Sequence, residues 1–202
     1  TGDQVDITRM AKLVVQGGVA SFTPRGMLNP VKNGEGKLIV SYSGHKAEAP
    51  VKVSGIGGKT RTDFIRDVGP ILSKAGCNQG TCHGSKDGRN GFKLSLRGYD
   101  ALYDIRAFTD DIKSRRVNVA SPDKSLMLLK ATGSVPHEGQ QVFKHGSKYY
   151  GIIRQWISQG AKLKLDTPRV KSIELFPSNP VVQRIGSLQQ VRVVANYADG
   201  SK

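Results

Sequence analysis

The chain's two cysteines stand close together, and a histidine follows the second one directly. Residues 77–83 read C-N-Q-G-T-C-H, so Cys77 and Cys82 are separated by four residues. Two thiols beside an imidazole are the groups that attach a haem covalently: the thiols add to its vinyl groups, and the histidine, here His83, ligates the iron. The usual spacing has two residues fewer, so two extra residues must bulge, and Gly80 permits an unusual backbone there. The motif predicts one covalently bound haem c, with its iron.

Two other uses of the cysteines stay open. An exported chain with two cysteines can close a small disulfide loop, here between Cys77 and Cys82. A zinc site is less favoured, because two cysteines and a few scattered histidines would have to supply all of its ligands. The surroundings of the motif favour the haem.

Helical patterns flank the motif on both sides. Residues 63–76 place apolar side chains at 64, 65, 68, 71, 72 and 75, with Thr62 or Asp63 as N-cap and Gly76 at the end. Residues 149–161 place apolar side chains at 149, 152, 153, 156 and 157 on one face. One helix therefore leads into the motif, and a second follows well downstream.

The segment between the motif and the last helix predicts further short elements. Residues 91–98 alternate like a strand, residues 99–108 fit a short helix, and a proline in the first turn opens a helix over 121–130. Most of their leucines and aromatic residues are expected in the core, and some must wall the haem.

The order of helix, C-x4-C-H and W-I-S-Q-G-A resembles a class I cytochrome c over roughly residues 59–165. More narrowly, G-C-N-Q-G-T-C-H-G, N-G-F-K-L-S-L-R-G-Y-D and P-H-E-G resemble the planctomycete-type cytochrome c domain that is found beside Ig-like modules in large exported proteins. The resemblance implies a mainly α domain that carries one haem for electron transfer. It also implies maturation outside the cytoplasm, in the periplasm or otherwise exported.

The resemblance also directs the search for the sixth iron ligand. Class I domains commonly carry a methionine in a loop before the last helix, but residues 134–139 read S-V-P-H-E-G. We therefore expect His137 as the distal ligand, unless it is a loop histidine that binds Glu138 or solvent. Met127 comes second, because a leucine-rich helix favours core packing for it, and His145 comes third. His45 lies in a strand turn, and we expect it to be distant from the iron. Two histidine ligands predict a lower reduction potential than histidine with methionine.

Both chain ends have strand patterns. Residues 5–7, 37–42, 49–53, 171–175 and 190–197 alternate or form short β-type runs, and turn residues separate them. In swapped order, the two ends resemble one bacterial Ig-like repeat of group 2, although no tryptophan lies near residues 11–15. We expect the ends to pair, within one chain or by strand exchange in a homodimer, because pairing buries both halves of a sandwich.

These observations predict an α+β chain of three segments. Residues 57–165 form a mainly α, class I-like cytochrome c domain, and residues 1–56 and 166–202 supply the two parts of an all-β, Ig-like sandwich. No apolar run approaches a membrane span, and residues 1–4 carry no signal-peptide pattern, so we expect a mature or excised fragment.

The charge bears on the partner. The formal net charge is +15, and residues 59–165 hold 19 basic against 9 acidic side chains. Such a surface steers acidic partners, so we expect an acidic redox protein. Nucleic acid is not expected, because the basic residues are dispersed and no recognition motif accompanies them. The densest cluster, Lys113 with Arg115 and Arg116, is expected to be a solvated loop.

The sequence favours one-electron transfer as the function, by an electron-transfer protein or the redox domain of a larger enzyme rather than by an enzyme in its own right. Two alternatives stay open. One is ligand sensing or peroxidase-like catalysis at an open iron position, and the other is an Ig-like adhesion or spacer module.

Overall fold

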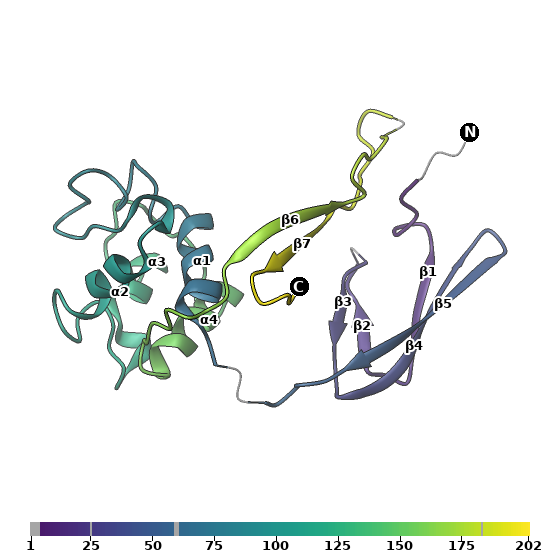
Figure 1. Cartoon of the computed structure of the whole chain (residues 1–202), viewed down its shortest axis with the longest axis horizontal. Coiled ribbons are helices and arrows are strands. Elements are labelled where there is room, and N and C mark those ends of the chain that lie inside the picture. The colour runs from purple at the N-terminus through teal and green to yellow at the C-terminus, as the bar shows by residue number, and fades with distance from the viewer. Residues whose placement is uncertain (1–4, 25, 59–60, 183) are drawn as a thin grey trace. The chain divides into compact units, whose positions relative to one another are not determined.

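The computed structural model describes residues 5–24, 26–58, 61–182 and 184–202, and the chain divides into two units (Figure 1). One unit is the central segment, Thr60–Arg169, and the other contains the chain ends, Thr1–Lys59 and Val170–Lys202. Residues 1–4, in which we found no signal-peptide pattern, lie outside the described residues.

The chain-end unit consists of small antiparallel sheets. The predicted runs at 37–42, 49–53 and 171–175 lie within strands, whereas residues 5–7 are not a strand. A turn at Ser43 and Gly44, both with positive φ, joins the longest two strands, as a two-residue hairpin requires. The sheets are β1 (Lys12–Gln16), β4 (Gly34–Tyr42) and β5 (His45–Val53); β2 (Ala20–Phe22) and β3 (Leu28–Pro30); and β6 (Val170–Phe176) and β7 (Arg192–Tyr197).

The expected Ig-like sandwich from the two chain ends is wrong. Within the described part of the chain, β6 and β7 pair with each other, and no ladder joins them to β1–β5. All seven residues of β6 are exposed, including Ile173 and Phe176 at 64% and 61%. Alternation predicts that a strand has an apolar face, but it does not specify which strand or sheet covers that face.

The central unit contains short helical elements joined by long loops. Its α-helices are α1 (Gly69–Lys74), α2 (Ala101–Thr109), α3 (Leu126–Ala131) and α4 (Lys148–Ser158). A short π-helix, η1 (Phe64–Val68), precedes α1, and two 3-10 helices, η2 (Leu96–Gly98) and η3 (Pro122–Lys124), lie between the others. The short helix predicted over 99–108 is confirmed by α2. The strand predicted over 91–98 is wrong, because Arg97 and Gly98 have positive φ values and close a turn.

The prediction of a mainly α, class I-like cytochrome c fold is also wrong. Of the described residues, 22% are helical and 23% are in strands, and the longest helix among them, α4, has 11 residues. The helix predicted over 63–76 is instead the five-residue π-helix η1 followed by the six-residue α1. Pro70 has no N–H to donate to residue 66, so a regular α-helix cannot run through this point. Glycine-rich loops take up much of the remaining length.

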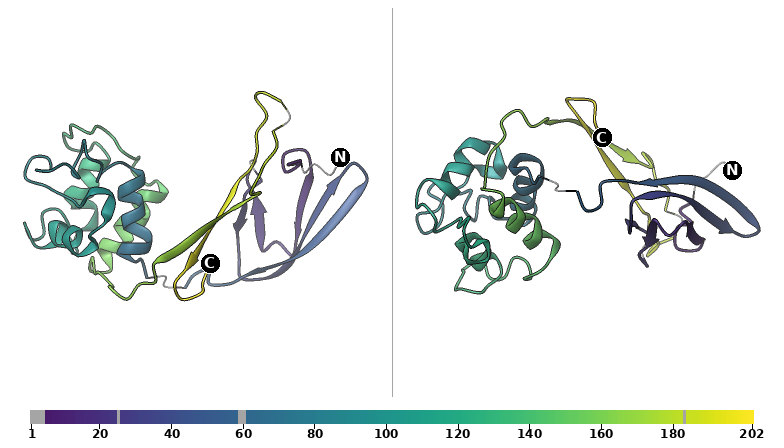
Figure 2. Two further views of the ribbon diagram at one scale, coloured as in Figure 1. Left: turned by 45° about the horizontal axis from the view of Figure 1, so that its top comes forward. Right: turned by 90° about the horizontal axis from the view of Figure 1, so that it is seen from below.

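The short helices of the central unit nevertheless lie close together (Figure 2), and one apolar core of buried side chains holds them. The predicted apolar face of α4 is confirmed, with Ile153, Trp156 and Ile157 nearly inaccessible to solvent. Trp156 packs on Phe64 of η1 with the ring centroids 5.2 Å apart, so the first and last helical elements of the unit meet in the core. Cys77 packs against the same cluster. The core thus fixes the start of the C-x4-C-H loop.

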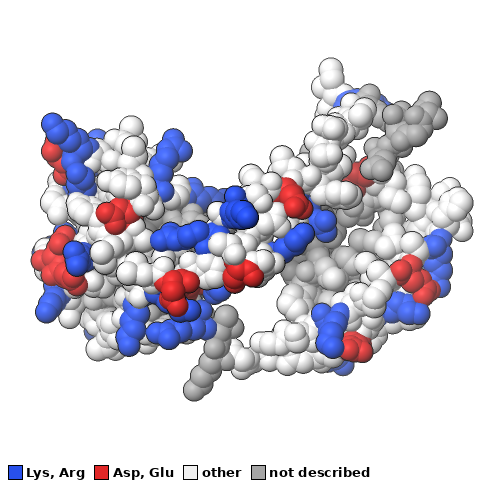
Figure 3. Space-filling model, viewed as in Figure 1, with Lys and Arg blue, Asp and Glu red and all other residues white. Residues whose placement is uncertain are grey.

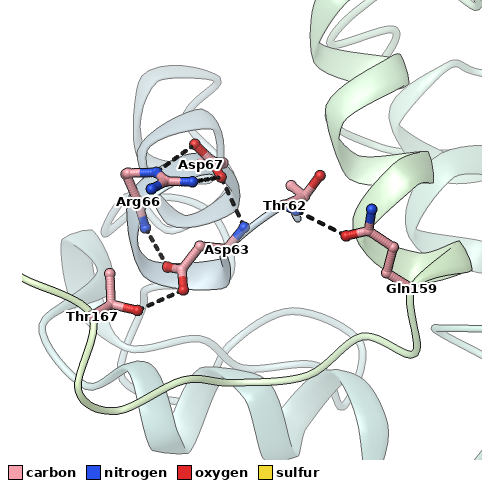
Figure 4. Close-up of polar contacts among 6 residues, drawn as sticks. All are labelled: Thr62, Asp63, Arg66, Asp67, Gln159 and Thr167. Atoms are coloured by element: carbon pink, nitrogen blue, oxygen red, sulfur yellow. Dashed lines mark hydrogen bonds and ion pairs between the residues drawn. The ribbon is translucent and has the colours of Figure 1, made fainter. Parts of the chain in front are cut away.

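A polar network fixes the start of η1 (Figure 4). The carboxylate of Asp63 caps the turn by accepting the N–H of Arg66 at 2.8 Å, and it also accepts the hydroxyl of Thr167 at 2.5 Å. The N–H of Thr62 donates to the side chain of Gln159 at 2.8 Å, just beyond α4. The cap is therefore Asp63 rather than Thr62, and the network ties together the two ends of the central unit.

We expect Asp63→Ala to destabilise the central unit measurably. Loss of an N-cap costs about 0.5–2 kcal/mol, and loss of the Thr167 contact adds to that cost. About 1 kcal/mol lowers the melting temperature of a domain of this size by about 4–8 °C. Thermal unfolding followed by circular dichroism measures the change, with Asp87→Ala, at an exposed position, as the matched control. Equal melting temperatures for the two variants would contradict the assigned role.

Candidate functional site

The C-x4-C-H loop is closed by its own backbone hydrogen bonds. The N–H of Cys77 donates to Leu72 at the end of α1, at 2.9 Å, and the N–H of His83 donates to Cys77 at 3.0 Å. Gly80 does not have a positive φ, so the unusual backbone expected there is wrong; the positive value, 83°, is at Gly76. Gly76 thus ends α1 and turns the chain into the loop. The four intervening residues bring the two cysteines and the histidine onto one short turn.

Both thiols are free and half-buried. Burial, with a smaller contribution from Cys82, raises the pKa of the Cys77 thiol to about 11. Because its charged form is disfavoured, Cys77 is a neutral thiol at neutral pH.

We expect the Cys77 thiol of the haem-free protein to alkylate slowly. With a pKa of about 11 instead of 9.0, the thiolate fraction at pH 8 falls about 100-fold. The rate should recover as the pH rises towards 11, or on unfolding. Iodoacetamide labelling read by peptide mass spectrometry measures the rate, with urea-unfolded protein as the control. A rate at pH 8 equal to that of the unfolded chain would contradict the burial of this thiol.

One ring nitrogen of His83, Nδ1, is hydrogen-bonded to the backbone. Its Nδ1 lies 3.0 Å from the carbonyl oxygen of Phe92, and its ring packs on the Phe92 ring with centroids 4.6 Å apart. A carbonyl can only accept, so Nδ1 carries the proton and the lone pair lies on Nε2. Burial, the largest cause, lowers the pKa of His83, which keeps the imidazole neutral. A neutral imidazole with its Nδ1–H held by a carbonyl is the usual form of a metal-binding histidine.

His137 is held in the same way from the loop between α3 and α4. Its Nδ1 lies 3.0 Å from the carbonyl oxygen of Gln140, so its lone pair is also on Nε2. The alternative that this histidine binds Glu138 is wrong, since its ring bonds to the backbone of Gln140 instead. Lys130 of α3 anchors the loop by donating to the Pro136 carbonyl at 2.6 Å.

A glycine beside His137 leaves room for the imidazole. A Cβ at Gly139 would lie 2.8 Å from Cε1 of His137, closer than such atoms approach. A side chain at position 139 would therefore clash with the His137 ring. The P-H-E-G phrase contains this glycine, but only the folded loop reveals its use.

The structure brings His83 and His137 together. Their rings are 9° from parallel, and their centroids lie 6.3 Å apart. Two imidazoles this close, each with its Nδ1 on a backbone carbonyl, are the residues that would hold one haem iron through their Nε2 atoms.

The other candidate ligands have different surroundings. Met127 is partly buried against the core, as expected for a residue of a leucine-rich helix. His145 packs on the ring of Tyr150 with centroids 4.3 Å apart. His45 begins β5 in the chain-end unit. Across the described residues, no group of three or more His, Cys, Asp or Glu side chains could hold a metal ion, which leaves the zinc alternative without a ligand set.

Two residues near His83, Phe92 and Arg116, were not predicted as part of the site. Phe92 supplies both the carbonyl acceptor and the ring contact described above. Arg116, expected in a solvated loop, is instead 8% exposed, and its guanidinium lies over the Phe92 ring. A charged residue within a basic run gives no sign of burial, because only its partners on other segments make burial tolerable.

Comparisons with known proteins add nothing to this description: no family model, no curated protein and no solved structure matches the chain. Within the described ranges, no helix has both the length and the apolar character needed to cross a membrane.

Proposed function

We propose that the central unit carries one haem c, attached through Cys77 and Cys82 and ligated by His83 and His137, and that it serves one-electron transfer outside the cytoplasm. The observation that carries the proposal is the pair of nearly parallel imidazoles 6.3 Å apart, each with its Nδ1 on a backbone carbonyl. When bound, a haem supplies a one-electron iron couple.

The chain's own residues hold and orient the group. The carbonyls of Phe92 and Gln140 fix the rotation of the two imidazoles, and the turn from Cys77 to His83 fixes the spacing between thiols and ligand. Two imidazoles would be available to hold the iron, whereas ligand sensing or peroxidase-like catalysis would need an open iron position, so we favour electron transfer. Two imidazoles also stabilise the ferric state more than an imidazole with a thioether does.

The charge of the central unit suits an acidic redox partner. Figure 3 shows lysines and arginines spread over its visible face, with acidic residues between them. Lys86 and Lys93 line a cavity of about 210 Å³ that Gly84, directly after His83, also lines. Exposed side chains of Leu96, Tyr99 and Tyr103 line the same cavity. An acidic partner would be steered to this surface, with a rate that falls as salt screens the attraction.

The deciding experiment uses the full chain expressed with an exported leader and the machinery for thioether formation. A reduced alkaline pyridine spectrum after acid-acetone extraction, together with the intact mass, tests covalent attachment. A haem-sized mass increase with a c-type spectrum supports the proposal. A chain without haem and two hydrogens lighter would instead indicate a Cys77–Cys82 disulfide, and the proposal would fail.

A further inference from the structure

Arg116 is a buried cation that lies over the Phe92 ring, and the same ring also contacts His83. Its side chain is 10% exposed, whereas its ion-pair partner, Asp111, is 53% exposed. One guanidinium nitrogen, Nη1, donates to the Ala107 carbonyl at 2.8 Å and to Asp111 at 3.1 Å, and the other, Nη2, donates to the Gly91 carbonyl at 3.0 Å. These bonds offset the cost of burying the charge.

A short series of contacts links this cation to the imidazole. The guanidinium carbon lies 4.6 Å from the centre of the Phe92 ring, and that ring lies 4.6 Å from the centre of the His83 ring. Arg116 also holds the carbonyl of Gly91, the residue before Phe92. Phe92 in turn supplies the carbonyl that accepts the Nδ1–H of His83. The guanidinium therefore contacts both the Phe92 ring and the backbone of residues 91–92, which set the orientation of His83.

The charge is only partly neutralised where it lies. Asp111 is more than half exposed, so solvent screens its negative charge, whereas Arg116 keeps its positive charge in a site of lower polarity. A fixed positive charge near a redox centre favours the state with one more electron. Arg116 would thus affect the proposed haem in two ways, through the orientation of His83 and through its own positive charge.

We propose that Arg116 is a positioning residue for His83, which holds the Phe92 carbonyl in place and raises the reduction potential of the haem by its buried charge. The proposal rests on the proposed function for its second half. Its first half concerns the imidazole alone and is measurable without haem.

Two substitutions separate position from charge. Arg116→Lys keeps the charge but loses the planar fork that bonds Ala107 and Gly91 and stacks on Phe92. Arg116→Met removes the charge and retains much of the side-chain length. The matched control is Arg115→Met, which removes the same formal charge from an exposed neighbour.

The experiment has two readouts on the full chain. In the haem-free protein, imidazole ¹⁵N shifts report the tautomer of His83: both Arg116 variants should lower the share protonated at Nδ1, and Arg115→Met should not. In the haem-loaded protein, Arg116→Met should shift the midpoint potential to more negative values, while Arg115→Met stays at the parent value. Arg116→Lys should shift the potential less than Arg116→Met does.

The outcomes distinguish this inference from the proposed function. Failure to load haem in the parent chain overturns the proposed function and the charge effect, while the tautomer readout still tests positioning. An unchanged tautomer in both Arg116 variants overturns positioning, and equal potential shifts for Arg115→Met and Arg116→Met overturn the charge effect. If Arg116→Met does not fold, Asp111→Asn replaces it: removal of the counter-charge should shift the potential to more positive values, and no shift or a negative one overturns the charge effect.

Discussion

The double variant Cys77→Ala with Cys82→Ala is expected to lose covalent haem completely. In the proposed attachment each thiol would form one thioether, so without both thiols nothing would link haem to the chain, and acid-acetone should extract whatever binds through the histidines. The pyridine spectrum of the extracted protein should fall to background, and the intact mass should equal that of the polypeptide. The free thiols on the turn between α1 and His83 are the observation behind this prediction.

The single variants are the controls for this experiment. Cys77→Ala and Cys82→Ala should each keep haem through the remaining thioether, with a pyridine band shifted by the vinyl group that stays free. Because Cys77 packs against the core, its removal should also lower thermal stability, by more than removal of Cys82. Covalent haem in the double variant would contradict the assignment of both cysteines.

Replacement of His137, the proposed second iron ligand, is expected to leave one coordination position of the iron free. If His137 holds the iron as proposed, His137→Ala removes one nitrogen ligand, so the ferric spectrum should change from low spin towards high spin. Carbon monoxide should then bind the reduced protein at saturating concentration, whereas the parent protein should bind little, because two imidazoles would hold its iron. Optical spectra with and without carbon monoxide measure both changes.

Two matched variants sharpen the His137 result. His145→Ala should leave the spectra unchanged, since that ring packs on Tyr150. Gly139→Ala should reproduce part of the effect of His137→Ala, because its Cβ would lie 2.8 Å from Cε1 of the imidazole. A sulfur-to-iron charge-transfer band in the oxidised parent that disappears in Met127→Ala would instead make Met127 the distal ligand.

Local patterns predicted individual elements well and their assembly poorly. The apolar face of α4 follows from the spacing of Ile153, Trp156 and Ile157, and α2 and the β4–β5 hairpin also follow from local sequence. Helix length did not follow, because Pro70 and the glycine-rich loops divide the central unit into short pieces. The expected sandwich failed for another reason: strand alternation gives an apolar face but not the strand that pairs with it.

The spacing of residues along the chain already shows which chemical groups are available: two thiols and an imidazole within seven residues, and a second imidazole before the last helix. How these groups are placed relative to one another follows from the folded central unit. The fold shows that His83 and His137 lie parallel, that backbone carbonyls hold both rings, and that Arg116 is buried over the Phe92 ring. The physical reason is that ring orientation and burial depend on contacts between segments far apart in the chain. Residue spacing does not encode these contacts, which form only when the core brings the segments together.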